Sequence, residues 1–100
     1  MSDSPTQELL FLYELEELLK SRKEEMPKGS YTTSLFQEGV EKVIQKVGEE
    51  AVEVLIASMS DQEEEIIYET ADLIYHLTVL LVQKGIPLDR IAAELKSRSR

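Results

Sequence analysis

The sequence predicts an all-α protein, a helical bundle of four to five helices that is completed by oligomerisation. Three observations support this prediction: apolar residues recur at helical spacing through long segments, no segment alternates apolar and polar residues as a strand does, and turn-forming residues separate the helical segments. The chain has 100 residues, of which 42% are apolar and 31% charged, as is typical of one globular domain, here residues 1–100. A domain of this size has a thin core, which favours oligomerisation.

The first expected helix begins at Ser4 and Pro5, because serine caps helices and proline is tolerated in the first turn. It should end at Met26, since Pro27 disfavours helical backbone in the residue before it. The apolar residues that define its buried face are Leu9, Leu12, Leu15 and Leu19. Residues 27–38 contain glycine and several hydroxyl side chains, so we expect a loop with at most one short turn of helix.

A second long helix is predicted from Gly39 to Ser58, where apolar residues follow helical spacing without a gap. Residues 60–63 (Ser-Asp-Gln-Glu) have the pattern of a capping box, so a third long helix should begin there. It should run to about Lys84, with Gly85 as its stop. Residues 88–96 are expected to form a short terminal helix, and the last four residues a frayed tail.

The composition excludes several classes of function. Eleven basic residues against twenty acidic ones give a net charge of −9, which opposes binding to nucleic acid. The absence of cysteine excludes disulfides and thiolate metal sites. The N-terminus lacks the features of a secretion signal, and no apolar run is long enough to span a membrane. We therefore expect no membrane partner and a cytoplasmic location.

Acidic residues gather on one flank of each of the two long helices, if each residue turns the helix by about 100°. The flank of the 39–58 helix carries Lys42, Lys46, Glu49, Glu50 and Glu53. Glu69 and Asp72 line one edge of the next helix. Packed antiparallel, the two helices can bring four carboxylates to one point, where they repel unless a cation lies between them. Oxygen donors without histidine or cysteine favour Mg2+, Mn2+ or Ca2+ over Zn2+. Of these ions we expect Mg2+. The alternative is that these acids form a solvated surface.

The helix that should end at Lys84 is apolar on two sides. Besides the stripe expected to face the core, it has a second apolar stripe, made of Tyr68, Ala71, Tyr75, Val79 and Val82. A helix that is apolar nearly all round must be buried nearly all round, so this stripe predicts a subunit interface. His76 has core residues as neighbours, and we expect a hydrogen-bonded histidine at the edge of the core, with no catalytic role.

Three segments together resemble a known family. They are residues 29–32 (Gly-Ser-Tyr-Thr), 42–53 (Lys-Val-Ile-Gln-Lys-Val-Gly-Glu-Glu-Ala-Val-Glu) and 68–77 (Tyr-Glu-Thr-Ala-Asp-Leu-Ile-Tyr-His-Leu). The chain resembles the phosphoribosyl-ATP pyrophosphatases of histidine biosynthesis, and the resemblance covers residues 9–98. Those enzymes belong to the MazG-type all-α NTP pyrophosphohydrolases, whose mark is Glu-Glu-x-x-Glu followed by Glu-x-x-Asp.

The resemblance implies magnesium-dependent hydrolysis of phosphoribosyl-ATP to phosphoribosyl-AMP and pyrophosphate, the second step of histidine biosynthesis. Mn2+ is an alternative to Mg2+. The implied metal ligands are Glu50, Glu53, Glu69 and Asp72. Glu49 and Glu50 are the implied catalytic acids, one of which orients or deprotonates the attacking water. The implied substrate-binding residues are Lys42 and Lys46 for the phosphates, and Ser30, Tyr31 and Thr32 in the loop.

Three other functions remain open at this point. A house-cleaning nucleoside triphosphate pyrophosphohydrolase would use the same acids, and only the loop at 29–32 argues against it. A non-catalytic helical dimerisation module would leave the acids solvated. A metal-binding regulator lacks a recognisable calcium-binding loop. The expected partners are a small-molecule substrate and further copies of this chain, as a homodimer or larger homo-oligomer.

Overall fold

The computed structural model describes residues 5–99, and within this range every regular element is a helix. In chain order the helices are α1 (Pro5–Leu9), α2 (Phe11–Glu25), α3 (Tyr31–Glu38), α4 (Val40–Ser60), α5 (Glu63–Lys84) and α6 (Leu88–Arg98). Leu10, between α1 and α2, itself has helical backbone angles, so these two helices form one nearly continuous segment. The all-α prediction is confirmed. No helix in the described range is long and apolar enough to cross a membrane.

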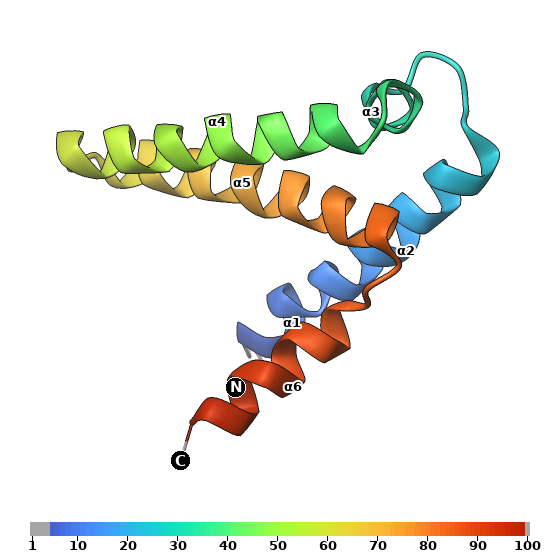
Figure 1. The fold of residues 1–100 in the computed structure, drawn as a ribbon. Coiled ribbons are helices and arrows are strands. Elements are labelled where there is room, and N and C mark those ends of the chain that lie inside the picture. The colour runs from blue at the N-terminus through green and yellow to red at the C-terminus, as the bar shows by residue number, and fades with distance from the viewer. Residues whose placement is uncertain (1–4, 100) are drawn as a thin grey trace.

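The two longest helices, α4 and α5, lie side by side as an antiparallel pair (Figure 1). Helix α2 packs against α5, and α3 packs against both α2 and α4. These four helices meet around a small core, whose most deeply buried side chains are Leu19, Leu35, Val43 and Val79, one from each helix. The other half of the α4/α5 pair, toward residues 61–62, extends away from the rest of the chain (Figure 1).

The segment expected to be mostly loop contains two turns of helix, α3. Ser30 has extended backbone and accepts a hydrogen bond from the Thr33 amide, so it caps the helix. Leu35 is 1% exposed and Phe36 packs on the core, so tertiary contacts stabilise a helix in a segment whose local composition favours a loop. The true loop is confined to residues 26–30, which places Ser30 and Tyr31 at the start of a helix.

Two of the expected helix ends agree with the structure and two differ from it. Met26, with φ 49°, ends α2 before the proline as predicted, and Gly85, with φ 72°, ends α5. The capping box predicted at residues 60–63 is wrong, because Ser60 still belongs to α4 and its hydroxyl donates to the Ala57 carbonyl. The terminal helix also continues to Arg98 rather than fraying after residue 96.

The stripe assigned to a subunit interface was placed on the wrong face of α5. Val79 and Val82 are buried inside the chain, and Tyr75 packs against the same core. The reason is that α2 and α3 cover this side of α5, a long-range packing that helical periodicity does not reveal. Tyr68, by contrast, is 70% exposed. The apolar side chains left exposed on α4 and α5 include Val52, Leu55, Ile56, Met59, Ile67 and Tyr68.

Candidate functional site

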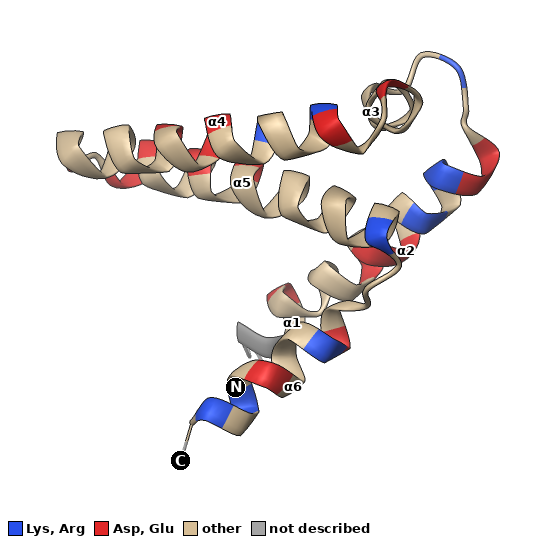
Figure 2. Ribbon diagram, viewed as in Figure 1, with Lys and Arg blue, Asp and Glu red and all other residues tan. Residues whose placement is uncertain are grey.

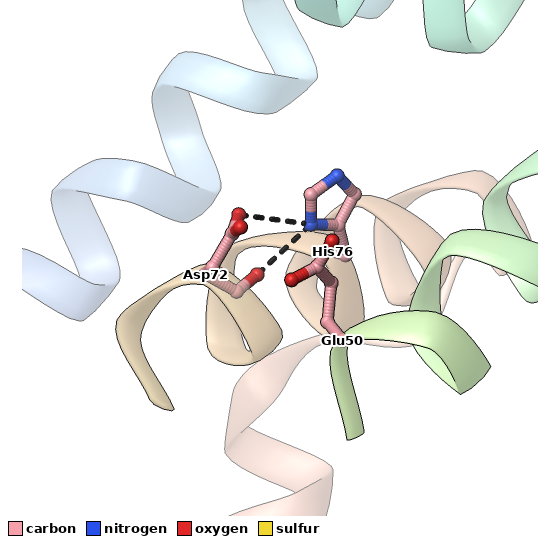
Figure 3. A group of neighbouring side chains, drawn as sticks. All are labelled: Glu50, Asp72 and His76. Atoms are coloured by element: carbon pink, nitrogen blue, oxygen red, sulfur yellow. Dashed lines mark hydrogen bonds and ion pairs between the residues drawn. The ribbon is translucent and has the colours of Figure 1, made fainter. Parts of the chain in front are cut away.

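A carboxylate and imidazole cluster lies between α4 and α5. Glu50 comes from α4, and Asp72 and His76 come from successive turns of α5 (Figure 3). One ligand atom from each of these residues lies within 4.8 Å of the others. His76 is 2% exposed and Glu50 is 8% exposed, whereas the Asp72 side chain is 35% exposed, so the cluster is buried at Glu50 and His76 and open to water at Asp72. This group of side chains is able to hold a metal ion.

His76 is held at both of its ring nitrogens. Its Nδ1 lies 2.9 Å from the backbone carbonyl oxygen of Asp72 and 3.3 Å from the Oδ1 atom of the same residue. Because a carbonyl oxygen can only accept, Nδ1 must carry a proton and donate it. Nε2 lies 3.0 Å from the Tyr31 hydroxyl, which donates to it when the imidazole is neutral. Neither nitrogen keeps a free lone pair, so the cluster offers a cation oxygen donors only.

The charge of Glu50 is disfavoured in the cluster. Burial raises the pKa of Glu50, a hydrogen bond with Asp72 and the negative charge of that residue raise it further, and Lys46 opposes the rise. The Lys46 Nζ atom lies 3.5 Å from Glu50 Oε2. Within the cluster, this ammonium group is paired with Glu50 and not with Asp72. Such an excess of carboxylate oxygens fits a hard divalent cation.

Glu53 and Glu69, which were also predicted to bind metal, do not join this cluster. Burial raises the pKa of Glu69, and the negative charges of Glu53, Asp72 and Glu65 raise it further. The four acids are therefore neighbours along the α4/α5 pair. The structure brings Glu50 and Asp72 together and leaves Glu53 exposed on the surface beside them.

Glu49 differs from Glu50 although the two are adjacent in sequence. Its side chain is half-exposed and accepts a hydrogen bond from Gln45 Nε2 at 2.8 Å. That bond lowers the pKa of Glu49, burial opposes the change, and Lys46 and Lys42 reinforce it. Glu49 is thus a carboxylate at the rim of the site, held ionised, whereas Glu50 is a buried one whose charge is disfavoured.

Lys46 is the cation at the centre of this acidic region. Its Nζ atom lies 3.5 Å from Glu49 Oε1 as well as from Glu50 Oε2. Burial disfavours the charged form, but interaction with Tyr31, Glu50 and Glu49 outweighs it and raises the pKa of Lys46. Lys46 therefore remains an ammonium group next to the cluster.

Tyr31 connects the loop to the cluster. Its hydroxyl bonds His76, and its ring stacks on Tyr75 with a centroid separation of 6.3 Å. The His76 ring in turn packs edge-on against both tyrosine rings. Burial raises the pKa of Tyr31, and Lys46 opposes the rise. Tyr31 is thus a neutral phenol at the border between the acidic cluster and the loop.

The two residues that flank Tyr31 have engaged side chains. The Ser30 hydroxyl oxygen caps α3 by accepting from the Thr33 amide. The Thr32 hydroxyl is buried and hydrogen-bonds the Tyr75 hydroxyl. Of the three loop residues predicted to bind substrate, only Tyr31 reaches the acidic cluster with its side chain.

Sequence reasoning identified His76 as a hydrogen-bonded core-edge residue, and the structure confirms this. It missed that the bonds of His76 join Tyr31 to Asp72. One signal was present, because His76 follows Asp72 by four residues and so lies on the same helix edge. The bond to Tyr31 spans 45 positions and has no local signal.

Comparison with known proteins gives a consistent result. Residues 12–99 match the family model described as phosphoribosyl-ATP pyrophosphohydrolase. A phosphoribosyl-ATP pyrophosphatase of Leptospira biflexa is 56% identical over 88 residues, which cover 88% of this chain and 96% of the relative. A protein of the same name from Metallosphaera sedula is 53% identical over 89 residues, covering 89% of this chain and 96% of the relative.

The chain also resembles parts of longer proteins. The histidine biosynthesis bifunctional protein HisIE of Bacteroides thetaiotaomicron is 52% identical over 90 residues, covering 90% of this chain and 44% of the relative. This chain therefore spans less than half the length of that bifunctional relative and nearly the whole length of the two shorter ones.

Proposed function

Because the chain belongs to the phosphoribosyl-ATP pyrophosphohydrolase family, we propose that it hydrolyses phosphoribosyl-ATP to phosphoribosyl-AMP and pyrophosphate, the second step of histidine biosynthesis. The observation that carries the proposal is the pairing of Glu50 and Asp72 across α4 and α5 in a chain of this family. A paired set of carboxylates beside a lysine is the arrangement that metal-assisted attack on a phosphoanhydride needs.

We propose Mg2+ as the cofactor, with Mn2+ as the alternative. Glu50 and Asp72 would hold it, with Glu53 and Glu69 as further ligands from the same two helices. The donor set supports this choice, because oxygen atoms are available and both nitrogens of His76 are already engaged. When bound, the ion neutralises negative charge on the phosphate oxygens and polarises the phosphoanhydride.

Glu50 and Glu49 are proposed as the acids that orient or deprotonate the attacking water. Their environments differ. Burial raises the pKa of Glu50 in the metal-free chain, and a bound cation would lower it again, so Glu50 acts on the water from beside the ion that it would hold. The pKa of Glu49 is lowered by its bond from Gln45, so Glu49 suits orientation of the water by hydrogen bonding. A proton taken from the water would reside on a carboxyl oxygen of one of these two acids.

Lys46 and Lys42 are proposed to bind the substrate phosphates. Lys46 lies next to Glu50, and Lys42 lies one helical turn before it on α4. Their ammonium groups would offset the charge of the triphosphate. Tyr31, Ser30 and Thr32 would line the substrate from the start of α3, with Tyr31 as the residue that reaches the acidic cluster.

We also propose that the protein, as one domain, works as a homodimer or larger assembly in the cytoplasm. The exposed apolar side chains of α4 and α5 support self-association, since Leu55 is 63% exposed and Met59 is 84% exposed. Leu55→Glu would place a charge in that interface without touching the core. We expect the wild type to sediment as an oligomer at micromolar concentration and Leu55→Glu to dissociate. A monomeric wild type would contradict the proposal.

The decisive experiment measures pyrophosphate release from phosphoribosyl-ATP, with Mg2+ present or removed by a chelator. We expect release that depends on Mg2+ and is lost in Asp72→Asn, which keeps the shape of the side chain and removes its charge. Common nucleoside triphosphates serve as the competing substrates. Equal or faster release from them would favour a house-cleaning enzyme, and no release from any substrate would favour a non-catalytic module.

A further inference from the structure

A polar pocket is lined in part by Tyr31, the residue whose hydroxyl bonds His76 of the acidic cluster. It has a volume of about 600 Å³ and lies between the end of α2 and the start of α3. Its lining residues are Arg22 and Glu25 of α2, residues 27–30 of the loop, and Tyr31 and Thr32 of α3. Because Arg22 and Lys28 are its two cations, we call it the Arg22/Lys28 pocket. It shares Ser30, Tyr31 and Thr32 with the proposed substrate site, and Arg22 and Lys28 have no role in the hydrolysis described above.

The cations of this pocket are available for an anion. In the described part of the chain, neither Arg22 nor Lys28 takes part in an ion pair, whereas Lys20 on the same helix pairs with Glu17 at 3.3 Å. Figure 2 shows basic residues near the end of α2 and in the loop that follows, with the acidic residues that end α2 between them. Glu25 is the one acid that lines the pocket, against its two cations. An unpaired guanidinium and ammonium at one pocket favour a phosphate, which arginine binds through two parallel hydrogen bonds.

Neutral donors border the same pocket. The backbone amides of Tyr31 and Thr32 are the first two of α3, so they have no hydrogen-bond partner within the helix. The Ser30 oxygen accepts from the Thr33 amide, which leaves the hydroxyl proton of Ser30 free to donate. These donors supplement the two cations, as donors at helix N-termini commonly do for phosphates.

Tyr31 places the Arg22/Lys28 pocket next to the catalytic cluster. It lines the pocket, and its hydroxyl bonds His76, which bonds Asp72 in turn. A substrate that fills both places must carry two anionic groups far apart on one molecule. Phosphoribosyl-ATP does so, because it has a triphosphate at one end and the phosphate of the added ribose at the other. ATP has only the triphosphate.

We propose that the Arg22/Lys28 pocket binds the phosphate of the phosphoribosyl arm and makes the enzyme select phosphoribosyl-ATP over ATP. This inference rests on the proposed function, which supplies the substrate. Arg22 and Lys28 act in binding and take no part in the chemical step. Their loss therefore weakens recognition of the arm and leaves the metal and triphosphate contacts intact.

The kinetic test uses Arg22→Gln and Lys28→Gln, with Lys20→Gln as the control that removes one positive charge from α2 outside the pocket. We expect each pocket variant to raise KM for phosphoribosyl-ATP by about tenfold or more with little change in kcat, since the arm contributes to binding in ground and transition states alike. The inhibition constant of ATP should stay within twofold of the wild type. Lys20→Gln should match the wild type in both measurements.

A binding test uses ribose 5-phosphate as the isolated arm and needs no turnover. In amide NMR spectra, it should shift the signals of Ser30, Tyr31 and Thr32 in the wild type and not in the Arg22→Gln, Lys28→Gln double variant. An unchanged KM in both single variants overturns the inference, as does an ATP inhibition constant that rises as much as KM. If the wild type releases no pyrophosphate from phosphoribosyl-ATP, the proposed function fails, and the NMR titration still decides whether the pocket binds a sugar phosphate.

Discussion

Two tyrosine hydroxyls join distant parts of the chain, one at each end of the molecule. Tyr13 of α2 donates to Asp89 Oδ1 of α6 at 2.9 Å, and Tyr31 of α3 bonds His76 Nε2 of α5 at 3.0 Å. The two bonds are nearly equal in length and differ in surroundings. Asp89 is exposed, whereas His76 is 2% exposed and holds Asp72 through its other nitrogen.

The comparison shows that burial decides what a hydrogen bond does for the molecule. Around Tyr13, water can replace a lost bond, and other contacts hold α2 and α6 together. They are apolar packing by residues such as Leu12, Leu88 and Leu95, and a hydrogen bond of 2.8 Å from the Leu88 amide to Glu16 Oε2. Around Tyr31, a lost bond leaves the Nε2 atom of the buried His76 ring without a partner, which costs about 1 to 3 kcal/mol. At the first end, the Tyr13 bond is therefore one contact among several, whereas at the second end the Tyr31 bond belongs to a chain of bonds that also holds Asp72.

The largest effect should come from the acids that the buried network holds. Glu50→Gln and Asp72→Asn should each lower kcat/KM by about 10²- to 10³-fold, as loss of a preorganised charged group commonly does. Steady-state pyrophosphate release measures this effect. The control is Glu8→Gln, an exposed acid at the opposite end. An acid-to-amide change in the network that leaves kcat/KM intact would break the comparison.

The same Glu50→Gln variant tests the electrostatic cost of the site. The pKa of Glu50 is raised in the folded chain, chiefly by burial, so the folded state binds its proton more tightly than the unfolded state does. Ionised Glu50 therefore lowers stability as the pH rises from the ordinary glutamate pKa through the raised one. We expect metal-free Glu50→Gln to be at least as stable as wild type at pH 8 in urea unfolding, and this advantage to vanish in acid. A less stable variant at pH 8 would mean that Lys46 compensates the charge fully.

Tyr31→Phe should give the next largest effect, a loss of about 10- to 100-fold in kcat/KM. Tyr31 bonds His76, which orients the proposed metal ligand Asp72, and loss of such an outer hydrogen-bond partner commonly has an effect of this size. In a His76→Ala background, Tyr31→Phe should have little further effect, since Tyr31 acts on the site through His76. Additive losses in the double variant would contradict this coupling.

The chain contains a single histidine, so its nitrogen-15 NMR spectrum reports this residue alone. At pH 8 we expect the proton on Nδ1 and a bare Nε2 that accepts from Tyr31. Tyr31→Phe should shift the Nε2 signal and leave the proton in place, because the Asp72 carbonyl still requires a donor. A proton on Nε2 in the wild type would contradict the assigned bonds. In that case Nδ1 would be available as a metal ligand.

Lys46→Ala should lower kcat/KM by about tenfold or more, which corresponds to at least about 1.4 kcal/mol of lost transition-state stabilisation. If Lys46 only paired with Glu49 and Glu50 at the surface, its removal would cost less than about 1 kcal/mol. Lys20→Ala, which breaks the exposed pair with Glu17, is the matched control. Equal behaviour of the two variants would remove Lys46 from the site.

Much of the fold could be predicted because its signals are local. Apolar spacing located the long helices. Their ends at Met26 and Gly85 could be predicted because Pro27 follows the first and the second is itself a glycine. Helix α3 could not be predicted, because its hydroxyl residues favour a loop and burial of Leu35 against other helices decides the outcome. The apolar face around Val79 was misassigned for the same reason, since periodicity gives a stripe and not its partner.

The candidate site divides in the same way. The i, i+3 spacing of acids on two helices with a short connection predicted that carboxylates meet, and the structure brings Glu50 and Asp72 together. The spacing could not tell which acids of each pair would be innermost, because that depends on the rotation of α4 against α5. The link from Tyr31 to His76 depends on where α3 packs, which no local pattern encodes.

The smallest effect is expected from Tyr13→Phe, which removes the bond that resembles the Tyr31 bond in length but lies in solvent. The melting temperature should stay within about 3 °C of the wild type, and kcat/KM should be unchanged, because water replaces the lost partner of Asp89.

The pH dependence offers a finer check. The hydrogen bond to Asp89, and then the charge of that residue, raise the pKa of Tyr13 above its ordinary value of 10.0. A raised pKa means that the contribution of the bond is present below pH 10 and is lost as the pH rises through the raised value. The difference between wild type and Tyr13→Phe should therefore be greatest near neutrality and disappear in alkali. A loss of activity in Tyr13→Phe similar to that of Tyr31→Phe would show that the two ends of the molecule are coupled, and that burial around His76 is not what separates the two tyrosines.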